Sequence, residues 1–268
     1  MIGRVKYLKS LRHQISSFNI WRRLVGLWSS LHRILIRVSQ VAGVGEPELW
    51  HVHPRQVLQV LTVRLRGSSD MIVFDQIFIR DEYSSLRSLE SVSLVLDLGA
   101  NVGYSSAYFL SCFPNSRVVA VEPDERNLEV CRVNLKPYGD RVLLLHGAVW
   151  SESTALCLSR GEREWATQVM LPPANSDGTI QAWDVDSLLR MAGAEQVDLL
   201  KVDIERSELA VFGETARNWL HKVRNICIEL HGLDCQETFF NSLADFDYEL
   251  EYSGELIICK NIRPSAAE

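Results

Sequence analysis

The sequence has no apolar run of about 18 residues or more, the length that a membrane-spanning helix needs. Its longest apolar stretch, near the N-terminus, is interrupted by Arg22, Arg23, Arg33 and Arg37. The same stretch lacks the uninterrupted apolar core and the small-residue cleavage site of a secretory signal. The sequence therefore predicts a cytoplasmic protein without a transmembrane helix.

Metal-binding patterns are also missing. The six cysteines, at positions 112, 131, 157, 227, 235 and 259, include no C-x-x-C pair. His51 and His53 would share one face of a strand, but no third ligand follows at a suitable spacing. The cysteines are predicted to be free thiols in a reducing compartment, and no metal site is predicted from these residues.

Acidic residues are absent from the first 45 positions, which hold eight Lys and Arg residues. Since the whole chain carries a net charge of −6, the remainder carries −14. Leu and Trp recur in this arm at helical spacings, which predicts basic amphipathic helices over residues 1–45. Such helices would pack on their own domain, mediate dimerisation or contact a membrane surface. The acidic body offers no basic track, so nucleic acid is not an expected partner.

Hydrophobic residues make up 47% of the chain, which predicts a folded protein with a sizeable core. Residues 46–91 are expected to hold N-terminal strands and a lead-in helix. Within them, residues 57–65 and 72–79 are β-branched and strand-like on either side of a turn at 67–70.

From residue 92 onward, short apolar runs alternate with helical segments. Strands are expected at 92–96, 117–121, 142–146, 197–202 and 225–230, and helices at 104–112, 125–135 and 208–220. This order predicts an α/β domain over residues 92–264, with a mostly parallel sheet covered by helices on both faces. Residues 150–187 are expected to be a loop-rich insertion, and residues 247–252 and 255–259 a terminal antiparallel hairpin.

The strongest motif is V-L-D-L-G-A-N-V-G-Y-S-S, residues 95–106. It predicts a strand ending near Asp97, a tight turn through Gly99, Ala100, Asn101 and Gly103, and a helix whose N-terminus points at a ligand. A dinucleotide fingerprint would need a further glycine in the middle of this turn. A carboxylate ahead of the loop would repel a pyrophosphate but attract an amino group, such as that of S-adenosylmethionine (SAM).

Two later strand ends extend this interpretation. Glu122 lies 19 residues after Gly103 and is followed by Pro123, a position where an acidic side chain binds ribose hydroxyls. The small residue Ala148 would let an adenine ring lie against the backbone.

These motifs, together with V-D-L-L-K-V-D-I-E-R-S-E-L and I-C-I-E-L-H, resemble the FkbM family of SAM-dependent methyltransferases. The resemblance spans about residue 70 to the terminal hairpin. It implies a Rossmann-like class I methyltransferase with a seven-stranded sheet, which methylates a hydroxyl of a sugar or small natural product. It also implies that Tyr83 closes over SAM, and the alternative for this residue is an ordinary packing tyrosine.

The acceptor side is predicted from two strand ends. Strand alternation would place Lys201, Asp203 and Glu205 on one side, and Glu229 and His231 at the same edge. Lys201 is expected to neutralise a neighbouring carboxylate. Asp203, Glu205 and His231 form the candidate catalytic set, with His231 as the base. The carboxylates could alternatively hold a divalent cation, a reading that is not favoured.

Arg206 stands where the family pattern commonly has glycine. Its guanidinium is predicted either to pair with Glu205 or Glu208, or to bind an anionic group of the acceptor. Two other functions stay open from the sequence. One is an NAD-dependent dehydrogenase on the same kind of sheet, and the other is a non-catalytic SAM-binding module that docks a partner.

Overall fold

The computed structural model describes residues 48–160, 167–170 and 178–266, so the predicted basic arm lies outside the described residues. The chain divides into two compact units, Met1–Asp81 and Glu82–Glu268. No helix within the described ranges is long and apolar enough to cross a bilayer.

The first unit contains a short hairpin followed by a helix. Strands β1 (Leu49–Val52) and β2 (Leu61–Arg64) pair antiparallel, and α3 (Asp70–Phe74) continues into a π-helical turn, Asp75–Ile79. The predicted strand over 72–79 is therefore wrong. Its buried residues, Asp70, Phe74, Ile77 and Phe78, follow helical spacing, and Asp70 forms an ion pair with Arg64 at 2.7 Å. Tertiary burial outweighs the β-branched composition.

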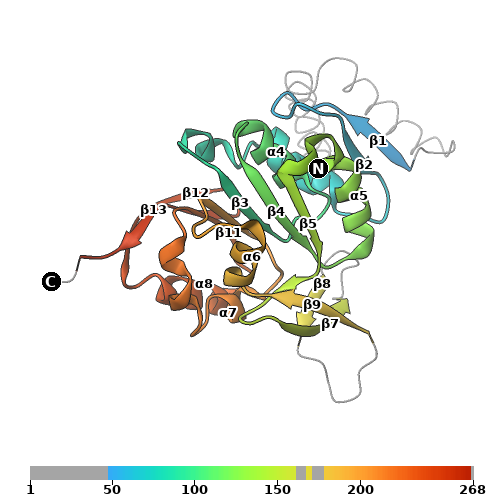
Figure 1. Ribbon diagram of the computed structural model, residues 1–268. Helices are drawn as coiled ribbons and strands as arrows, with labels where there is room; N and C mark the ends of the chain where they lie inside the picture. The colour runs from blue at the N-terminus through green and yellow to red at the C-terminus, as the bar shows by residue number, and fades with distance from the viewer. Residues whose placement is uncertain (1–47, 161–166, 171–177, 267–268) are drawn as a thin grey trace, which may run out of the picture. The chain divides into compact units, whose positions relative to one another are not determined.

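The second unit is built on a seven-stranded sheet with the order β12-β13-β11-β10-β3-β4-β5 (Figure 1). The parallel core consists of β3 (Leu94–Leu98), β4 (Arg117–Glu122), β5 (Val142–His146), β10 (Leu199–Val202) and β11 (Ile226–Glu229). The hairpin of β12 (Phe246–Ser253) and β13 (Leu256–Pro264) closes one edge, with β13 antiparallel to β11. The predicted Rossmann-like sheet with a terminal hairpin is confirmed.

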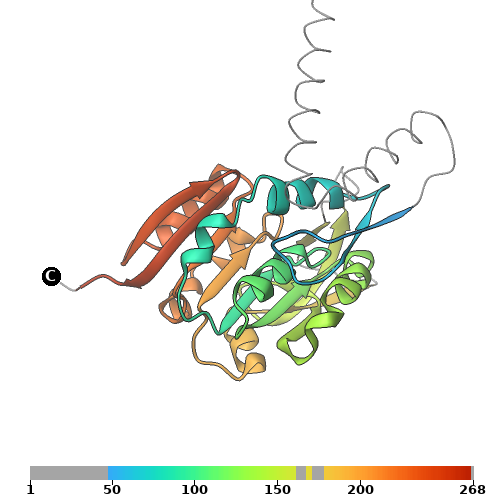
Figure 2. The same ribbon diagram turned by 90° about the horizontal axis from the view of Figure 1, so that it is seen from above.

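Helices cover both faces of this sheet (Figures 1 and 2). They are α4 (Tyr104–Cys112), α5 (Glu125–Leu135), α6 (Val185–Ala192), α7 (Glu208–Val211) and α8 (Leu233–Ser242). Asp124 caps α5 by accepting a hydrogen bond from the Arg126 N–H at 2.8 Å, and Asp184 caps α6 in the same way through the Ser187 N–H at 2.8 Å. These caps fix where the chain turns back over the sheet.

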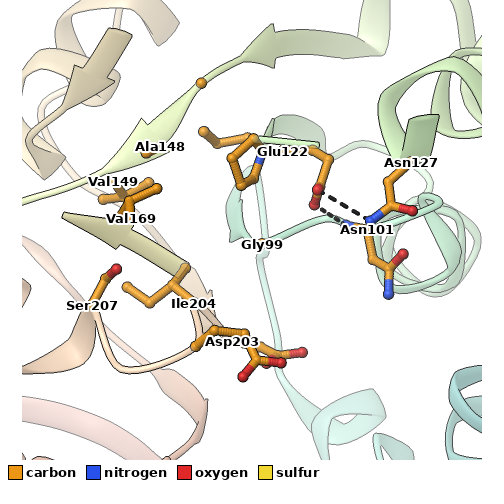
Figure 3. Close-up of a pocket in the computed structure, with 14 residues that line it drawn as sticks. Gly99, Asn101, Glu122, Asn127, Ala148, Val149, Val169, Asp203, Ile204 and Ser207 are labelled. Carbon is orange, nitrogen blue, oxygen red and sulfur yellow. Dashed lines mark hydrogen bonds between the residues drawn. The ribbon is translucent and has the colours of Figure 1, made fainter. Parts of the chain in front are cut away.

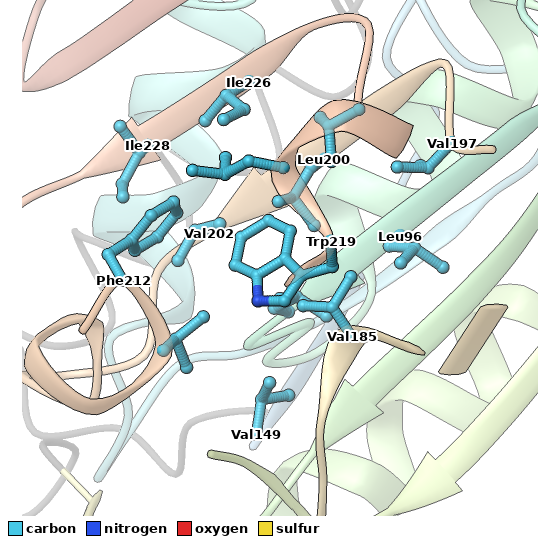
Figure 4. Close-up of a cluster of buried hydrophobic side chains, with 14 of the residues drawn as sticks. Leu96, Val149, Val185, Val197, Leu200, Val202, Phe212, Trp219, Ile226 and Ile228 are labelled. Carbon is cyan, nitrogen blue, oxygen red and sulfur yellow. The ribbon is translucent and has the colours of Figure 1, made fainter. Parts of the chain in front are cut away.

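A large hydrophobic core lies between the sheet and helices α6, α7 and α8. Leu200 and Ile228 from the strands meet Phe212, Trp219 and Val185 from the helical side (Figure 4). Burial of several large apolar side chains, each contributing about 2 kcal/mol, holds the strand ends in register.

A second sheet replaces the predicted loop-rich insertion. Its order is β6-β9-β7-β8, formed by β6 (Ala148–Val149), β7 (Thr154–Arg160), β8 (Thr167–Met170) and β9 (Thr179–Trp183). The prediction for 150–187 was therefore wrong for β7, β8, β9 and α6, although residues 161–166 and 171–177 of that segment lie outside the described ranges. Strand β9 alternates as a half-buried strand does, because Ile180 and Ala182 are buried while Thr179 and Gln181 are exposed.

The helix predicted over 208–220 is much shorter. Helix α7 ends at Val211, and two 3-10 turns follow at Ala216–Asn218 and Leu220–Lys222. Gly213 interrupts the apolar periodicity, and its N–H donates to the Ala210 carbonyl rather than continuing the α-helical pattern. Helix α8 was not predicted.

Candidate active site

The turn after β3 packs against neighbouring strands. The N–H of Gly99 donates to the Val121 carbonyl at 3.0 Å. Gly99 has a φ of +80°, and a Cβ on it would lie 1.8 Å from the Asp203 carbonyl oxygen. Gly103 has a φ of +83°, and its Cβ would lie 2.9 Å from Cys131 Sγ. Both positions therefore require glycine for the packing of this turn against its neighbours in the same chain, whether or not a ligand also approaches the backbone.

Asp97 is fully buried near the end of β3. Its Oδ2 accepts hydrogen bonds from the hydroxyls of Ser105 and Ser106, each at 2.6 Å, in the first turns of α4. Its Oδ1 lies 3.3 Å from the Lys201 ammonium and has no hydrogen-bond partner among the described residues. Asp97 therefore ties the start of α4 to β10, and its Oδ1 retains an unused acceptor position.

Glu122 anchors the same turn from β4. Its Oε2 accepts from the Asn101 N–H at 2.7 Å, and its Oε1 accepts from the Asp124 N–H at 2.9 Å and the Asn127 amide at 3.3 Å (Figure 3). Burial raises the pKa of Glu122 to about 7, although these hydrogen bonds lower it. The Asn101 side-chain oxygen nearby is buried without a hydrogen-bond partner in the described part of the chain.

A pocket opens at the carboxyl ends of the strands, the position where open α/β sheets bind ligands. Glu122 and Asn127 stand on one side, Asp203 and Ile204 on the other, with Gly99 between them (Figure 3). The lining comprises Gly99, Asn101, Val121, Glu122, Pro123, Asn127, Gly147, Ala148, Val149, Val169, Asp203, Ile204, Glu205 and Ser207. Seven of the predicted site residues are in this set: Gly99, Asn101, Glu122, Pro123, Ala148, Asp203 and Glu205.

Tyr83 is buried among aromatic side chains. Its ring packs on those of Tyr108 and Phe109, with centroid distances of 5.5 and 4.9 Å. Burial, together with nearby negative charge that includes Asp203 and Glu229, raises the pKa of its hydroxyl. Tyr83 is therefore a neutral packing residue within electrostatic reach of the acidic side chains.

Lys201 links the ends of two central strands. Its ammonium donates to the Gly99 carbonyl at 2.6 Å and lies 3.6 Å from Asp203 Oδ2. The predicted counter-ion role is confirmed, because the same ammonium also contacts Asp97. Burial opposes the charged form, but the carboxylates of Asp97 and Asp203 outweigh it and raise the pKa of Lys201.

The segment after β10 does not continue as a strand. β10 ends at Val202, and Glu205 and Arg206 adopt left-handed φ values of +49° and +79°. The Arg206 guanidinium pairs with Asp234 and donates to the His231 carbonyl at 2.8 Å. It therefore contacts the N-terminal region of α8, and it forms an ion pair with Asp234 rather than with Glu205 or Glu208, the two predicted partners.

His231 is surrounded by carboxylates. Its Nδ1 lies 3.0 Å from Glu208 Oε1, while its Nε2 lies 3.7 Å from Asp203 and 3.8 Å from both Glu205 and Glu229. Burial lowers the pKa of His231, but Glu208, Asp203 and Glu205 outweigh burial and raise it to about 9. The imidazole is thus protonated at neutral pH, which disfavours the predicted role as a base.

Two acidic residues belong to this cluster beyond the predicted catalytic set. Glu208 is completely buried, and its Oε1 also accepts from the Ile204 N–H at 3.2 Å. Glu229 ends β11, and burial together with the charge of Asp203 raises its pKa to about 7. Both stand in motifs that the sequence displays, S-E-L and I-C-I-E-L-H. Glu229 was expected at the same sheet edge as His231, whereas only the tertiary structure brings Glu208 to the imidazole.

Asn127 and Val169 are further pocket residues without a local signal in the sequence. Val169 comes from the second sheet, which was not expected. In the part of the chain that the structure describes, no group of three or more His, Cys, Asp or Glu side chains is arranged to hold a metal ion.

The sequence of this chain is similar to those of known proteins. The model of the methyltransferase FkbM domain matches residues 97–253. AMB antimetabolite synthetase AmbE of Pseudomonas aeruginosa is 26% identical over 198 residues, covering 59% of this chain and 9% of AmbE. The 2-O-methyltransferase NoeI of Sinorhizobium fredii is 24% identical over 166 residues, covering 51% of this chain and 62% of NoeI.

The chain thus spans less than two thirds of the length of both curated relatives. Among solved structures, an O-methyltransferase from Bacillus cereus in complex with SAH is 15% identical, with a TM-score of 0.42. That match covers 68% of this chain and 79% of the other.

Proposed function

The chain belongs to the family of the methyltransferase FkbM domain, and we propose that it transfers a methyl group from SAM to a hydroxyl of a sugar or small natural product. The observation that carries this proposal is the pocket where Glu122 faces Asp203 across Gly99 (Figure 3). The O-methyl assignment is supported by the relative NoeI, a 2-O-methyltransferase.

The residues present fit SAM. Asn101 Oδ1 is a buried acceptor without a partner in the described residues, and it lines the pocket beside the turn. It is suited to the amino group of SAM, while the Glu122 carboxylate is suited to the two ribose hydroxyls. Asp97 supports SAM binding indirectly, because it anchors the turn that carries Asn101. Its Oδ1 is an additional hydrogen-bond acceptor without a partner among the described residues. Ala148, Val149 and Val169 form the apolar wall for the adenine ring.

SAM supplies an electrophilic methyl group when it is bound. The work of this chain is to align an acceptor oxygen with that group, which can account for several kcal/mol of the barrier. Asp203 and Glu205 line the pocket and carry hydrogen-bond acceptors suited to hydroxyl groups. His231 orients them through its Nε2. An anionic group on the acceptor would reach Arg206 only by competing with Asp234.

Calorimetric titration tests the cofactor. SAM and S-adenosylhomocysteine are expected to bind, and NAD is not. At pH 8, where Glu122 is ionised, Glu122→Gln should weaken SAM binding by roughly 10- to 100-fold, because hydrogen bonds to a charged group contribute about 1.5–3 kcal/mol. Glu237→Gln, at an exposed position of α8, is the matched control and should bind SAM like the wild-type protein. Equal affinity in all three proteins would contradict the assignment of Glu122.

The acceptor class requires a transfer experiment. Labelled SAM is incubated with the protein and a cell extract, and the labelled product is identified. A methyl ether on a sugar or small molecule is the expected product. Tight SAM binding without any labelled product would instead favour the non-catalytic alternative.

A further inference from the structure

The His231 ring already holds the proton that a general base would have to accept. Glu208 is fully buried and holds Nδ1 at 3.0 Å, and the Nε2 side faces Asp203, Glu205 and Glu229 within 3.8 Å. An imidazole among four carboxylates is stabilised as a cation. The group that receives the acceptor proton must therefore be sought among the carboxylates.

The carboxylates differ in how they are engaged. Glu205 stands on the loop after β10, where no strand holds it in register. Glu208 is excluded as a proton acceptor from the substrate because its side chain is 0% exposed. Asp203 is already engaged by two cations, because it lies 3.6 Å from the buried Lys201 ammonium and 3.7 Å from His231 Nε2. Glu229 has His231 as its ion-pair partner, and its side chain is 28% exposed.

The backbone fixes the position of Glu229. It is the last residue of β11, and it pairs in register with Leu256 of β13. β11 also lies directly beside β10, so Glu229 is held at the sheet edge where Asp203 emerges. A rigid strand end places a catalytic carboxylate more reproducibly than a loop does.

We propose that Glu229 accepts the proton of the acceptor hydroxyl, and that His231, held by Glu208, is a positioning residue that keeps Glu229 and Asp203 oriented. This inference rests on the proposed O-methyl transfer. In the step, the acceptor oxygen forms a bond to the methyl carbon as the carbon–sulfur bond breaks, and that electron pair stays on sulfur. The hydroxyl proton passes to the Glu229 carboxylate, which becomes a neutral acid and releases the proton to solvent through its exposed side.

The charges around Glu229 agree with this role. Burial and the charge of Asp203 raise the pKa of Glu229 to about 7, which is well placed for a base at neutral pH. His231 and Lys201 lower it. The groups that face Glu229 from the packed elements are Lys201, Asp203, His231, Glu255 of the β12–β13 turn and the Tyr83 hydroxyl.

The first experiment needs no acceptor. The full-length protein is labelled with ¹³C at the glutamate carboxyl groups, and the Glu229 signal is assigned as the one lost in Glu229→Gln. We expect its titration midpoint near pH 7. We also expect the midpoint to rise in His231→Asn, which removes the neighbouring cation. A midpoint in the ordinary acidic range, or one indifferent to His231→Asn, would overturn the proposal.

The second experiment measures the rate of methyl transfer from labelled SAM to a panel of methyl glycosides between pH 6 and 9. Glu229→Gln should lower kcat by about 100-fold and abolish the rise of the rate with pH around 7, while SAM affinity is unchanged. Glu229→Asp, which keeps a carboxylate, should recover part of kcat. Glu237→Gln on the exposed face of α8 is the matched control and should behave as the wild type.

These experiments distinguish a failure of the proposed role of Glu229 from a failure of the proposed methyl transfer. If Glu229→Gln transfers methyl groups at the wild-type rate, or keeps the wild-type pH dependence, the role of Glu229 is overturned while the proposed function stands. If the wild-type protein binds SAM but methylates no glycoside or other oxygen acceptor, the proposed function fails, and the role of Glu229 fails with it.

Discussion

At the scale of single residues, Gly99 shows how closely the turn after β3 is packed. Two constraints meet there: a left-handed φ of +80°, and the Asp203 carbonyl oxygen only 1.8 Å from where a Cβ would be. Gly193, which ends α6, shares the first constraint with a φ of +62° but has no atom within 4 Å of its Cβ position. Substitutions at the two glycines therefore separate the free-energy cost of a side chain at left-handed φ from the free-energy cost of a steric clash.

Gly99→Ala should lower the free energy of unfolding by more than about 3 kcal/mol, because Asp203 and the end of β10 must shift. Gly193→Ala should cost only about 1 kcal/mol, the penalty for a side chain at left-handed φ. Urea unfolding followed by tryptophan fluorescence measures both. Similar losses in the two variants would show that β10 yields to the added methyl group.

Residue identity was sufficient to predict several pocket residues. Glu122, Asn101 and Ala148 were expected from strand ends and turn chemistry alone, and they line the pocket. The protonation of His231 was not predictable, because it results from carboxylates at positions 203, 205 and 208, which reach the ring only in the folded chain.

At the scale of elements, the parallel pair β3 and β10 depends on a buried charge network. Lys201 pairs in register with Asp97 across the two strands and bonds to the Gly99 carbonyl. The ammonium offsets the buried charge of Asp97 and also faces Asp203.

Lys201→Met should destabilise the protein by about 3–5 kcal/mol, because it leaves the Asp97 carboxylate buried without its cation. Lys222→Met removes a cation that is paired with Asp186 at 2.7 Å, where both side chains are about one third exposed. That control should cost less than about 1 kcal/mol. The comparison is made by denaturant unfolding at pH 7. Equal losses of unfolding free energy in the two variants would mean that the ion pairs of the buried Lys201 contribute no more to stability than the exposed pair of Lys222.

Element prediction succeeded where periodicity and turn signals agreed. The strands around β3, β4 and β5 are continuous apolar runs between helices, and the terminal hairpin has a Ser-Gly turn. Element prediction failed in 150–187, because strands β7, β8 and β9 of the second sheet are only four to seven residues long and turn-forming residues stand between them. It also failed in 72–79, where burial selects a helix from residues that favour strands.

At the scale of the whole molecule, the raised pKa values of His231, Glu122 and Glu229 all make the fold less stable as the pH rises. The pKa of His231 is raised from 6.5 to about 9, so its stabilising contribution is complete below pH 6.5 and is lost as the pH rises through 9. Glu122 and Glu229 hold their protons up to about pH 7 in the folded state, compared with an ordinary value of 4.5. Deprotonating them therefore destabilises the fold between pH 4.5 and 7.

The free energy of unfolding should consequently fall as the pH rises from 5 to 9. His231→Asn should flatten the part of this profile above pH 6.5, whereas His221→Asn, at an exposed position, should leave it unchanged. Denaturant midpoints measured at intervals of one pH unit provide the test. A profile that rises across this range, or one insensitive to His231→Asn, would contradict the electrostatic arrangement around β11.

The sequence by itself determined the alternation of strands and helices, the glycine turn after β3 and the acidic strand ends, because these depend on periodicity and on neighbours within a few residues. Only the tertiary structure decided that Gly99 must make room for Asp203, that a second sheet supplies Val169 to the pocket, and that the carboxylates of residues 203, 205 and 208 stabilise the protonated form of His231. Those features arise from contacts and electric fields between segments far apart along the chain, so no local pattern encodes them.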